Sequence, residues 1–199
     1  MSKTRLEAFS DGVIAILITI MVLELKVPEG TDFAALGPLG PVFIAYIVSF
    51  VFVAIYWVNH HHLLQMTTVI DGRVLWANLV FLFWLSLFPF ATGWMGESAI
   101  APVPTAIYGV VALLATIAYF ILERALVASP DQTPELGKLI GGYPKTKASV
   151  LIYIIAIPVA LVAPWVAFAL YIVDAAIWFI PDQRFEQVPA GRVGRPKRP

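Results

Sequence analysis

The chain alternates long apolar runs with short polar connections. Four runs are long enough to cross about 30 Å of hydrocarbon as helices. They lie at residues 6–25, 41–58, 74–95 and 105–127. The pattern therefore predicts membrane-spanning helices at these four positions.

A fifth apolar stretch, residues 148–180, is too long for one crossing. As a single helix its 33 residues would extend about 50 Å at 1.5 Å per residue. Pro164, near its middle, cannot donate to the helical hydrogen-bond ladder and disfavours helix at the preceding residue. We therefore expect two short helices, at residues 148–162 and 165–180. The prediction is an all-α polytopic membrane protein with six transmembrane helices.

The basic residues predict how this protein is oriented. Six helices with cytoplasmic N- and C-termini leave only Lys26 outside. Twelve basic residues then lie inside: Lys3, Arg5, Arg73, Arg124, Lys138, Lys145, Lys147, Arg184, Arg192, Arg195, Lys197 and Arg198. Five helices would instead move the basic residues of the tail outside. The positive-inside bias therefore favours six helices in a multi-pass protein of the cell membrane.

Composition narrows the function class. The chain is 60% hydrophobic and 13% charged, against about 25% charged in soluble domains. We expect one membrane domain at residues 1–181 and a disordered basic tail at residues 182–199. Zero net charge with scattered basic residues argues against nucleic acid as a partner. The absence of cysteine excludes disulfides and thiolate metal sites.

No sequence motif indicates an enzyme, a cofactor or a metal site. The chain has no nucleophile–base arrangement, phosphate loop or metalloprotease motif in a usable context. His60, His61 and His62 are consecutive, so on a helix they point in three directions and do not converge on one ion. We therefore expect a protein without catalytic residues, cofactor or bound metal.

The first predicted helix has two different faces. At 100° per residue, Ile16, Ile20 and Leu23 lie within about 40° of one direction, and Thr19 lies about 60° to one side. Ser10 and Asp11 point about 120–140° away from this aliphatic stripe. A charged group inside a membrane is a functional candidate because it needs a partner or water.

Polar residues of other helices offer such partners. In the predicted topology Asn59, His60, Asn78 and Asp174 share the depth of Asp11. Buried polar groups in lipid must be paired, so a hydrogen-bonded clamp that fixes the first helix accounts for them. The stripe is then free to face an ion pathway. The alternative is that the stripe faces lipid while the polar pair packs on neighbouring helices.

The opening motif, Arg5-x-x-x-Phe9-Ser10-Asp11, resembles the RxxxFSD signature of the transmembrane protein 175 potassium channels in their single-repeat prokaryotic form. In that family the serine and aspartate are packing and gating elements. The similarity continues at Tyr56-Trp57-x-Asn59-His60-His61, Asn78-x-x-Phe81-Leu82, Pro89-Phe90 and Trp178-Phe179-Ile180-Pro181. It covers essentially the whole transmembrane region.

The resemblance implies four subunits around a central pore lined by the first helices. Hydrophobic layers on that helix would form the constriction. The constriction isoleucine of the family falls on Ile16, and the next layers fall on Ile20 and Leu23. The threonine associated with potassium preference falls on Thr19.

Glu24 lies about 40° from Ile20, near the outer end of the first helix. In a tetramer it could form an acidic ring that concentrates cations at the pore mouth. The alternatives are an ion pair with Lys26 or a position at the lipid interface.

The sequence thus predicts a homotetrameric, potassium-favouring cation channel controlled by a hydrophobic constriction. Its partners would be potassium ions and the lipid bilayer. A second hypothesis is a proton-coupled transporter or proton leak that uses Asp11, His60 and Asp174 as a relay. A third is a non-conducting membrane scaffold.

Overall fold

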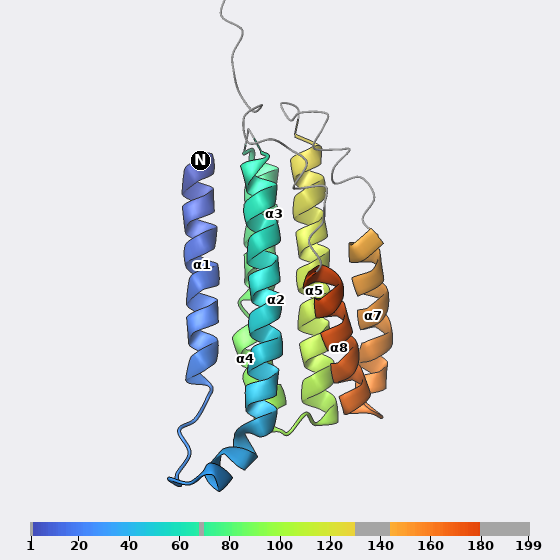
Figure 1. Ribbon diagram of the computed structural model, residues 1–199. Helices are drawn as coiled ribbons and strands as arrows, with labels where there is room; N and C mark the ends of the chain where they lie inside the picture. Colours follow the sequence, from blue (N-terminus) through green and yellow to red (C-terminus); the bar gives the residue numbers. More distant parts are fainter. Residues whose placement is uncertain (1, 68–69, 130–143, 180–199) are drawn as a thin grey trace, which may run out of the picture.

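The computed structural model describes residues 2–67, 70–129 and 144–179, which form a bundle of antiparallel helices (Figure 1). The elements are α1 (Lys3–Leu23), the 3₁₀ helix η1 (Phe33–Leu39), α2 (Gly40–Gln65), α3 (Gly72–Leu85), α4 (Phe88–Glu97), α5 (Pro102–Val127), α7 (Pro144–Ala160) and α8 (Pro164–Phe179). The predicted tail at residues 182–199 lies outside the described residues.

The order of helices agrees with the predicted all-α membrane protein. Within the described residues, four stretches are long and apolar enough to cross a membrane, at Lys3–Leu23, Phe33–Gln65, Gly72–Glu97 and Pro102–Val127. The helices α7 and α8 are shorter, at 17 and 16 residues. The chain reverses between them just before Pro164, as the sequence predicts. Which end of the bundle faces the cytoplasm stays a prediction.

Two predicted spans differ in detail from the helices of the structure. The span expected at 74–95 is divided into α3 and α4, because Pro89 has no N–H to donate to the carbonyl of Leu85. The span expected at 41–58 continues to Gln65. Its polar extension is tolerated because His60 is fully buried and hydrogen-bonded to Asn78 of α3.

Asp71 fixes the start of α3. Its carboxylate accepts a hydrogen bond from the backbone N–H of Val74 at 2.9 Å, which caps the helix. This bond lowers the pKa of Asp71. The same carboxylate accepts from the hydroxyl of Ser129 at 3.3 Å, so the start of α3 is tied to the end of α5.

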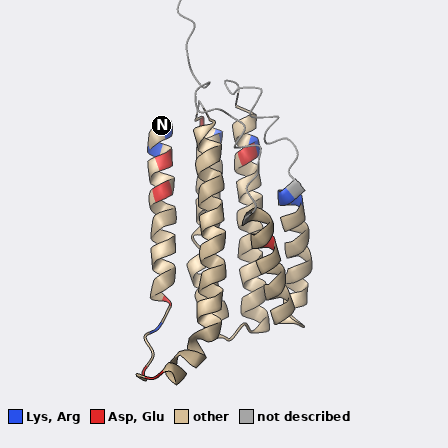
Figure 2. Ribbon diagram, in the orientation of Figure 1, with Lys and Arg blue, Asp and Glu red and all other residues tan. Residues whose placement is uncertain are grey.

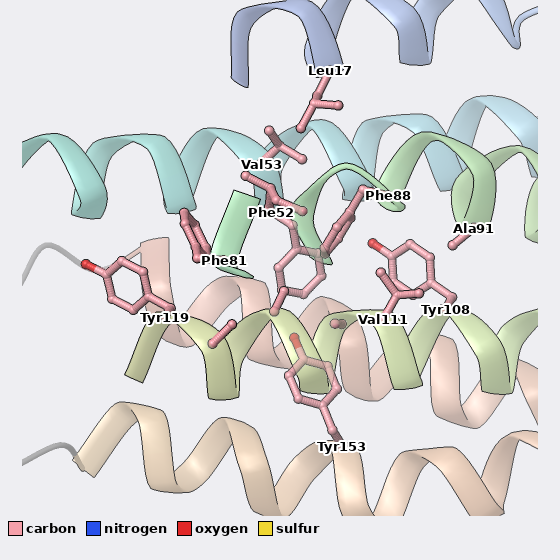
Figure 3. Packing of buried hydrophobic residues seen from close by; sticks show 14 of the residues in the cluster. Leu17, Phe52, Val53, Phe81, Phe88, Ala91, Tyr108, Val111, Tyr119 and Tyr153 are labelled. Carbon is pink, nitrogen blue, oxygen red and sulfur yellow. The ribbon is translucent and has the colours of Figure 1, made fainter. Parts of the chain in front are cut away.

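The centre of the bundle is an aromatic core around α5. Phe88 meets Tyr108 edge-on with ring centroids 5.6 Å apart, and Phe81 meets Tyr119 at 5.4 Å. Figure 3 shows these rings between the helices, with Tyr153 reaching in from α7. In contrast, α1 lies at the edge of the bundle (Figure 1), where it packs on α2, α3 and α4.

Gly96 permits the close approach of α4 to α2. A Cβ atom at this position would lie 2.8 Å from the Cα atom of Val42, which is backbone and cannot move aside. We expect Gly96→Ala to destabilise the protein by about 1–3 kcal/mol, as overpacked sites do. Thermal unfolding in detergent measures the effect. Gly72→Ala is the matched control, because a Cβ there meets nothing within 4 Å. Equal unfolding temperatures for the two variants would contradict the prediction.

Candidate functional site

One face of α1 packs on the bundle and the opposite face is exposed. The buried side chains are Leu6, Ser10, Ile14, Leu17 and Met21. The predicted stripe lies on the other side, with Ile16 57%, Ile20 40% and Leu23 77% exposed. Thr19 is exposed beside them. Three large aliphatic side chains on an edge helix are therefore only partly covered by the described part of the single chain.

Thr19 has its own hydrogen bond within α1. Its hydroxyl donates to the carbonyl of Ile16 at 2.8 Å. A hydroxyl that donates to its own backbone keeps its oxygen lone pairs free. The oxygen of Thr19 can therefore still accept a hydrogen bond or contact an ion.

The buried face of α1 is held by a chain of three polar side chains. The side-chain amide of Asn78 donates to the hydroxyl of Ser10 at 3.0 Å. The carbonyl oxygen of the same amide lies 2.7 Å from Nε2 of His60. All three residues are fully buried. These two hydrogen bonds join α1, α3 and α2. They fix the rotation of α1 about its own axis because Ser10 must face Asn78.

The acidic residues predicted at this depth lie in other contacts. Asp11 is half-buried and accepts from the indole N–H of Trp57 at 2.9 Å, which is a second link between α1 and α2. Asp174 faces α7, where its two carboxyl oxygens lie within hydrogen-bond distance of the hydroxyl groups of Ser149 and Tyr153. The structure thus brings Ser10, His60 and Asn78 together and separates Asp174 from them. Similar depth in a membrane does not determine which neighbour a helix face meets.

The remaining motif residues are less constrained. Phe9 is 50% exposed and Arg5 is exposed at the start of α1. Asn59 donates to the carbonyl of Ile55 within its own helix at 2.8 Å. The ring of His61 stacks on Trp57 with centroids 5.7 Å apart. No group of three or more histidine, aspartate or glutamate side chains in the described residues could hold a metal.

The sequence allows an ion pair between Glu24 and Lys26 as one alternative. The structure does not contain this ion pair. Lys26 forms its ion pair with Glu97 at the end of α4. The hydrogen bond and negative charge of Glu97 raise the pKa of Lys26. The carboxylate of Glu24 lies against α4, where a Cβ added at Gly93 would be 2.8 Å from its Oε2 atom. Glu24 therefore lies against α4 at the C-terminal end of α1.

Sequence reasoning missed several polar residues of the bundle. Trp57 was part of a motif but was not assigned to Asp11. An indole N–H in a membrane helix needs an acceptor, and this requirement is the signal that could have identified the pair. A buried set formed by Thr92, Ser49 and Tyr108 also joins α4, α2 and α5. Isolated hydroxyl residues in apolar helices give no signal that predicts their partners.

Asn78 links α3 to both α1 and α2, so its loss should weaken the bundle. Asn78→Ala removes the acceptor of the buried His60 ring and the donor to Ser10, and an unpaired buried polar group costs about 1–3 kcal/mol. We expect a lower thermal unfolding temperature in detergent. Asn59→Ala is the matched control, because its amide bonds only to its own helix. If Asn78→Ala unfolded no earlier than Asn59→Ala, the polar chain would not support α1.

Comparison with known proteins assigns the chain to a family. The family model of the endosomal/lysosomal potassium channel TMEM175 matches residues 5–89. A potassium channel of a Chryseobacterium species is 49% identical over 187 residues, which cover 94% of this chain and 97% of that relative. The endosomal/lysosomal proton channel TMEM175 of Bos taurus is 44% identical over 75 residues, 32% of this chain and 16% of that protein.

A solved structure extends the similarity to the fold. The crystal structure of a lysosomal potassium-selective channel TMEM175 homologue from Chamaesiphon minutus has a TM-score of 0.78 and 27% sequence identity. The match covers 89% of this chain and 96% of that chain. The similarity thus spans nearly the full length of both the bacterial relative and the solved homologue. The predicted resemblance is confirmed: the chain belongs to the TMEM175 family of potassium channels.

Proposed function

We propose that the chain is a subunit of a potassium-favouring channel whose ion pathway runs along the exposed face of α1. The main observation in support is the exposed aliphatic stripe of α1. Its direction is fixed, because Asn78 holds the opposite face of the same helix against the bundle. Ile16, Ile20 and Leu23 supply the apolar layers of a hydrophobic constriction, which controls ion passage by its hydration. The bacterial relatives named as potassium channels support potassium as the ion.

One helix cannot enclose a pore, so the proposal requires several copies. We place four copies around a central axis, each presenting the α1 stripe to it. Closed rotational symmetry brings the same face of each copy to the axis. The position of α1 at the edge of the bundle (Figure 1) supports this arrangement, because the rest of each subunit can remain outside the ring.

We place the channel in the cell membrane. In the proposed orientation both termini lie in the cytoplasm. Figure 2 shows Lys and Arg at the end of the bundle where α1 begins, while Lys26 lies beyond the opposite end of α1. The positive-inside rule supports a cytoplasmic position for the first of these ends. Residues 1–181 would form the channel domain. Glu24, against the wall of α4, would then lie near the extracellular mouth.

A proton leak is a second candidate, supported by the name of the matching bovine protein, a proton channel. A proton relay through Asp11, His60 and Asp174 has little geometric support. These groups belong to three separate hydrogen-bonded sets in the described residues. A proton pathway, if present, would more simply follow water in the α1 pore than cross between these sets.

Ion flux into liposomes distinguishes the candidates. Purified protein is reconstituted under gradients of potassium, sodium or protons, with protein-free vesicles as the control. Potassium flux that exceeds sodium flux supports the proposal. Proton flux without potassium flux supports the proton leak. Correctly assembled protein with no flux of any of the three ions supports a scaffold.

The constriction can be tested at Ile16. Ile16→Asn places a polar group in the apolar layer, so it should hydrate the constriction, raise cation flux several-fold and weaken ion discrimination. Single-channel recording in planar bilayers measures both effects. The matched control is Ile154→Asn on α7, because Ile154 is 56% exposed but lies away from α1. If the two variants conducted alike, Ile16 would face lipid and the proposed pathway would be wrong.

Thr19 can be tested as a determinant of selectivity. A dehydrating potassium ion needs oxygen ligands, which the aliphatic layers do not provide. Thr19→Val keeps the side-chain shape and removes the hydroxyl, so it should preserve conduction and reduce the preference for potassium over sodium. The reversal potential under bi-ionic conditions measures this preference. Thr19→Ser, which keeps the hydroxyl, should retain it. An unchanged reversal potential in Thr19→Val would assign selectivity to other residues.

A further inference from the structure

A small pocket lies inside the subunit, away from the exposed face of α1. It is formed by α2, α5, α7 and α8 and lies in the half of the bundle nearer the start of α1. Its lining residues are Phe52, Ile55, Tyr56, Asn59, Thr116, Tyr119, Thr146, Asp174 and Trp178. The pocket has room for about one water molecule.

Asp174 lies in the wall of this pocket and is held by two hydroxyl groups of α7. Ser149 and Tyr153 each approach one of its carboxyl oxygens, both at 2.6 Å. The indole N–H of Trp178 donates to the hydroxyl oxygen of Ser149 at 2.7 Å. The set joins α7 and α8 and shares no hydrogen bond with the set formed by Ser10, Asn78 and His60.

Among the described residues, no salt bridge gives the carboxyl group of Asp174 a cationic partner. Asp174 is only 1% exposed. The salt bridges among the described residues join Lys3 with Glu7 and Lys26 with Glu97, so neither includes Asp174. An isolated charge in such surroundings is strongly disfavoured, and a buried group of this kind usually takes up a proton instead.

Hydrogen-bond accounting shows that a neutral Asp174 is fully satisfied. The hydroxyl of Ser149 lies 3.1 Å from the carbonyl of Lys145 and can donate to it. Its oxygen then accepts from both Trp178 and the protonated Asp174, while Tyr153 donates to the second carboxyl oxygen. Every polar hydrogen in the set has an acceptor in this arrangement. The ionised form also keeps its hydrogen bonds, but its charge stays unpaired.

The pocket supplies a site for the water that exchanges such a proton. Tyr119 and Thr146, which carry hydroxyl groups, also line the pocket, and these residues are only 4% and 6% exposed. Internal water usually occupies sites of this kind, where the space is large enough and several polar groups are at hand. A water molecule in the pocket could contact them and lie beside the carboxyl group of Asp174.

We propose that Asp174, with Ser149, Tyr153, Trp178 and the adjoining pocket, forms a proton-binding site inside each subunit, separate from the α1 pathway. The proton takes the place of a cation in balancing the buried carboxyl group. The site does not depend on α1 lining a pore, so it stands or falls independently of the proposed channel function. It is also separate from Asp11 and His60.

The surroundings of this site contain other ionisable groups from each neighbouring helix. They are Tyr56 of α2, Tyr108 and Tyr119 of α5, Tyr153 and Lys145 of α7, Tyr171 of α8, and Glu123 one turn beyond Tyr119. Lys145 lies over the Trp178 ring, with its Nζ atom 5.8 Å from the ring centroid. Glu123 has a buried Oε2 atom without a hydrogen-bond partner in the described residues, so it is the second acid that a test must distinguish.

Infrared difference spectroscopy of the full chain in lipid vesicles tests the proposal. At neutral pH the wild type should show the carbonyl band of a protonated carboxylic acid, and Asp174→Asn should lose that band while keeping the shape of the side chain. Glu123→Gln is the matched control and should keep it. Tyr153→Phe should keep the band but shift it to higher wavenumber, because the carbonyl loses a hydrogen bond. This shift remains a test even if Asp174→Asn fails to fold.

Two results would overturn the proposal. The first is an identical carbonyl band in the wild type, Asp174→Asn and Tyr153→Phe, which would mean that Asp174 carries no proton. The second is a band assigned to Asp174 that is present in N-methylglucamine buffer and absent in potassium buffer. In that case a bound potassium ion would balance the carboxyl group, and the pocket would be a cation site.

Discussion

The hydrogen-bonded chain from Ser10 through Asn78 to His60 is the interaction on which the rest of the proposed pathway depends. The hydrocarbon of the membrane offers no water to form hydrogen bonds with these side chains, so they must form them within the bundle. The partner of Ser10 lies on α3, and this requirement sets which side of α1 turns inward. The exposure of Ile16 on the other side follows from it. A polar contact thereby orients an apolar surface.

The helix α1 packs on one side of a bundle whose inner helices also contact one another directly. Its aromatic core surrounds α5, and buried hydroxyl groups such as Ser49, Thr92 and Tyr108 tie α2, α4 and α5 together. These contacts do not involve α1. The edge helix α1 adds Leu6, Ile14, Leu17 and Met21 to the buried core, and its polar links to α2 and α3 determine how it is rotated.

The sequence predicted the elements that depend on local pattern. Helical periodicity placed Ile16, Ile20 and Leu23 together, and the structure exposes all three. Pro164 predicted the reversal between α7 and α8. The partners of Asp174 could not be predicted in this way, because they depend on how α8 rotates against α7. That rotation is set by packing over the whole interface, and no local pattern encodes it.

Helix ends were also hard to predict where polar residues are buried. The polar run that begins at Asn59 looked like the end of a span, yet α2 continues to Gln65 because His60 meets an acceptor on another helix. A hydropathy pattern counts each polar residue as unfavourable in the membrane. It cannot register that Asn78, 18 positions later, removes much of the cost.

Gly93 illustrates how an uncharged position can govern surface electrostatics. The carboxylate of Glu24 rests where any side chain at position 93 would have to be. The absence of a Cβ atom at Gly93 therefore leaves space on α4 for the carboxylate of Glu24, which lies at the end of α1. A relative with a larger residue at this position would carry the same acid in a different place, displaced from α4. Comparing the net charge of related sequences would overlook this difference. The electrostatic field at that end of the protein depends on the space left by Gly93 as well as on the carboxylate of Glu24.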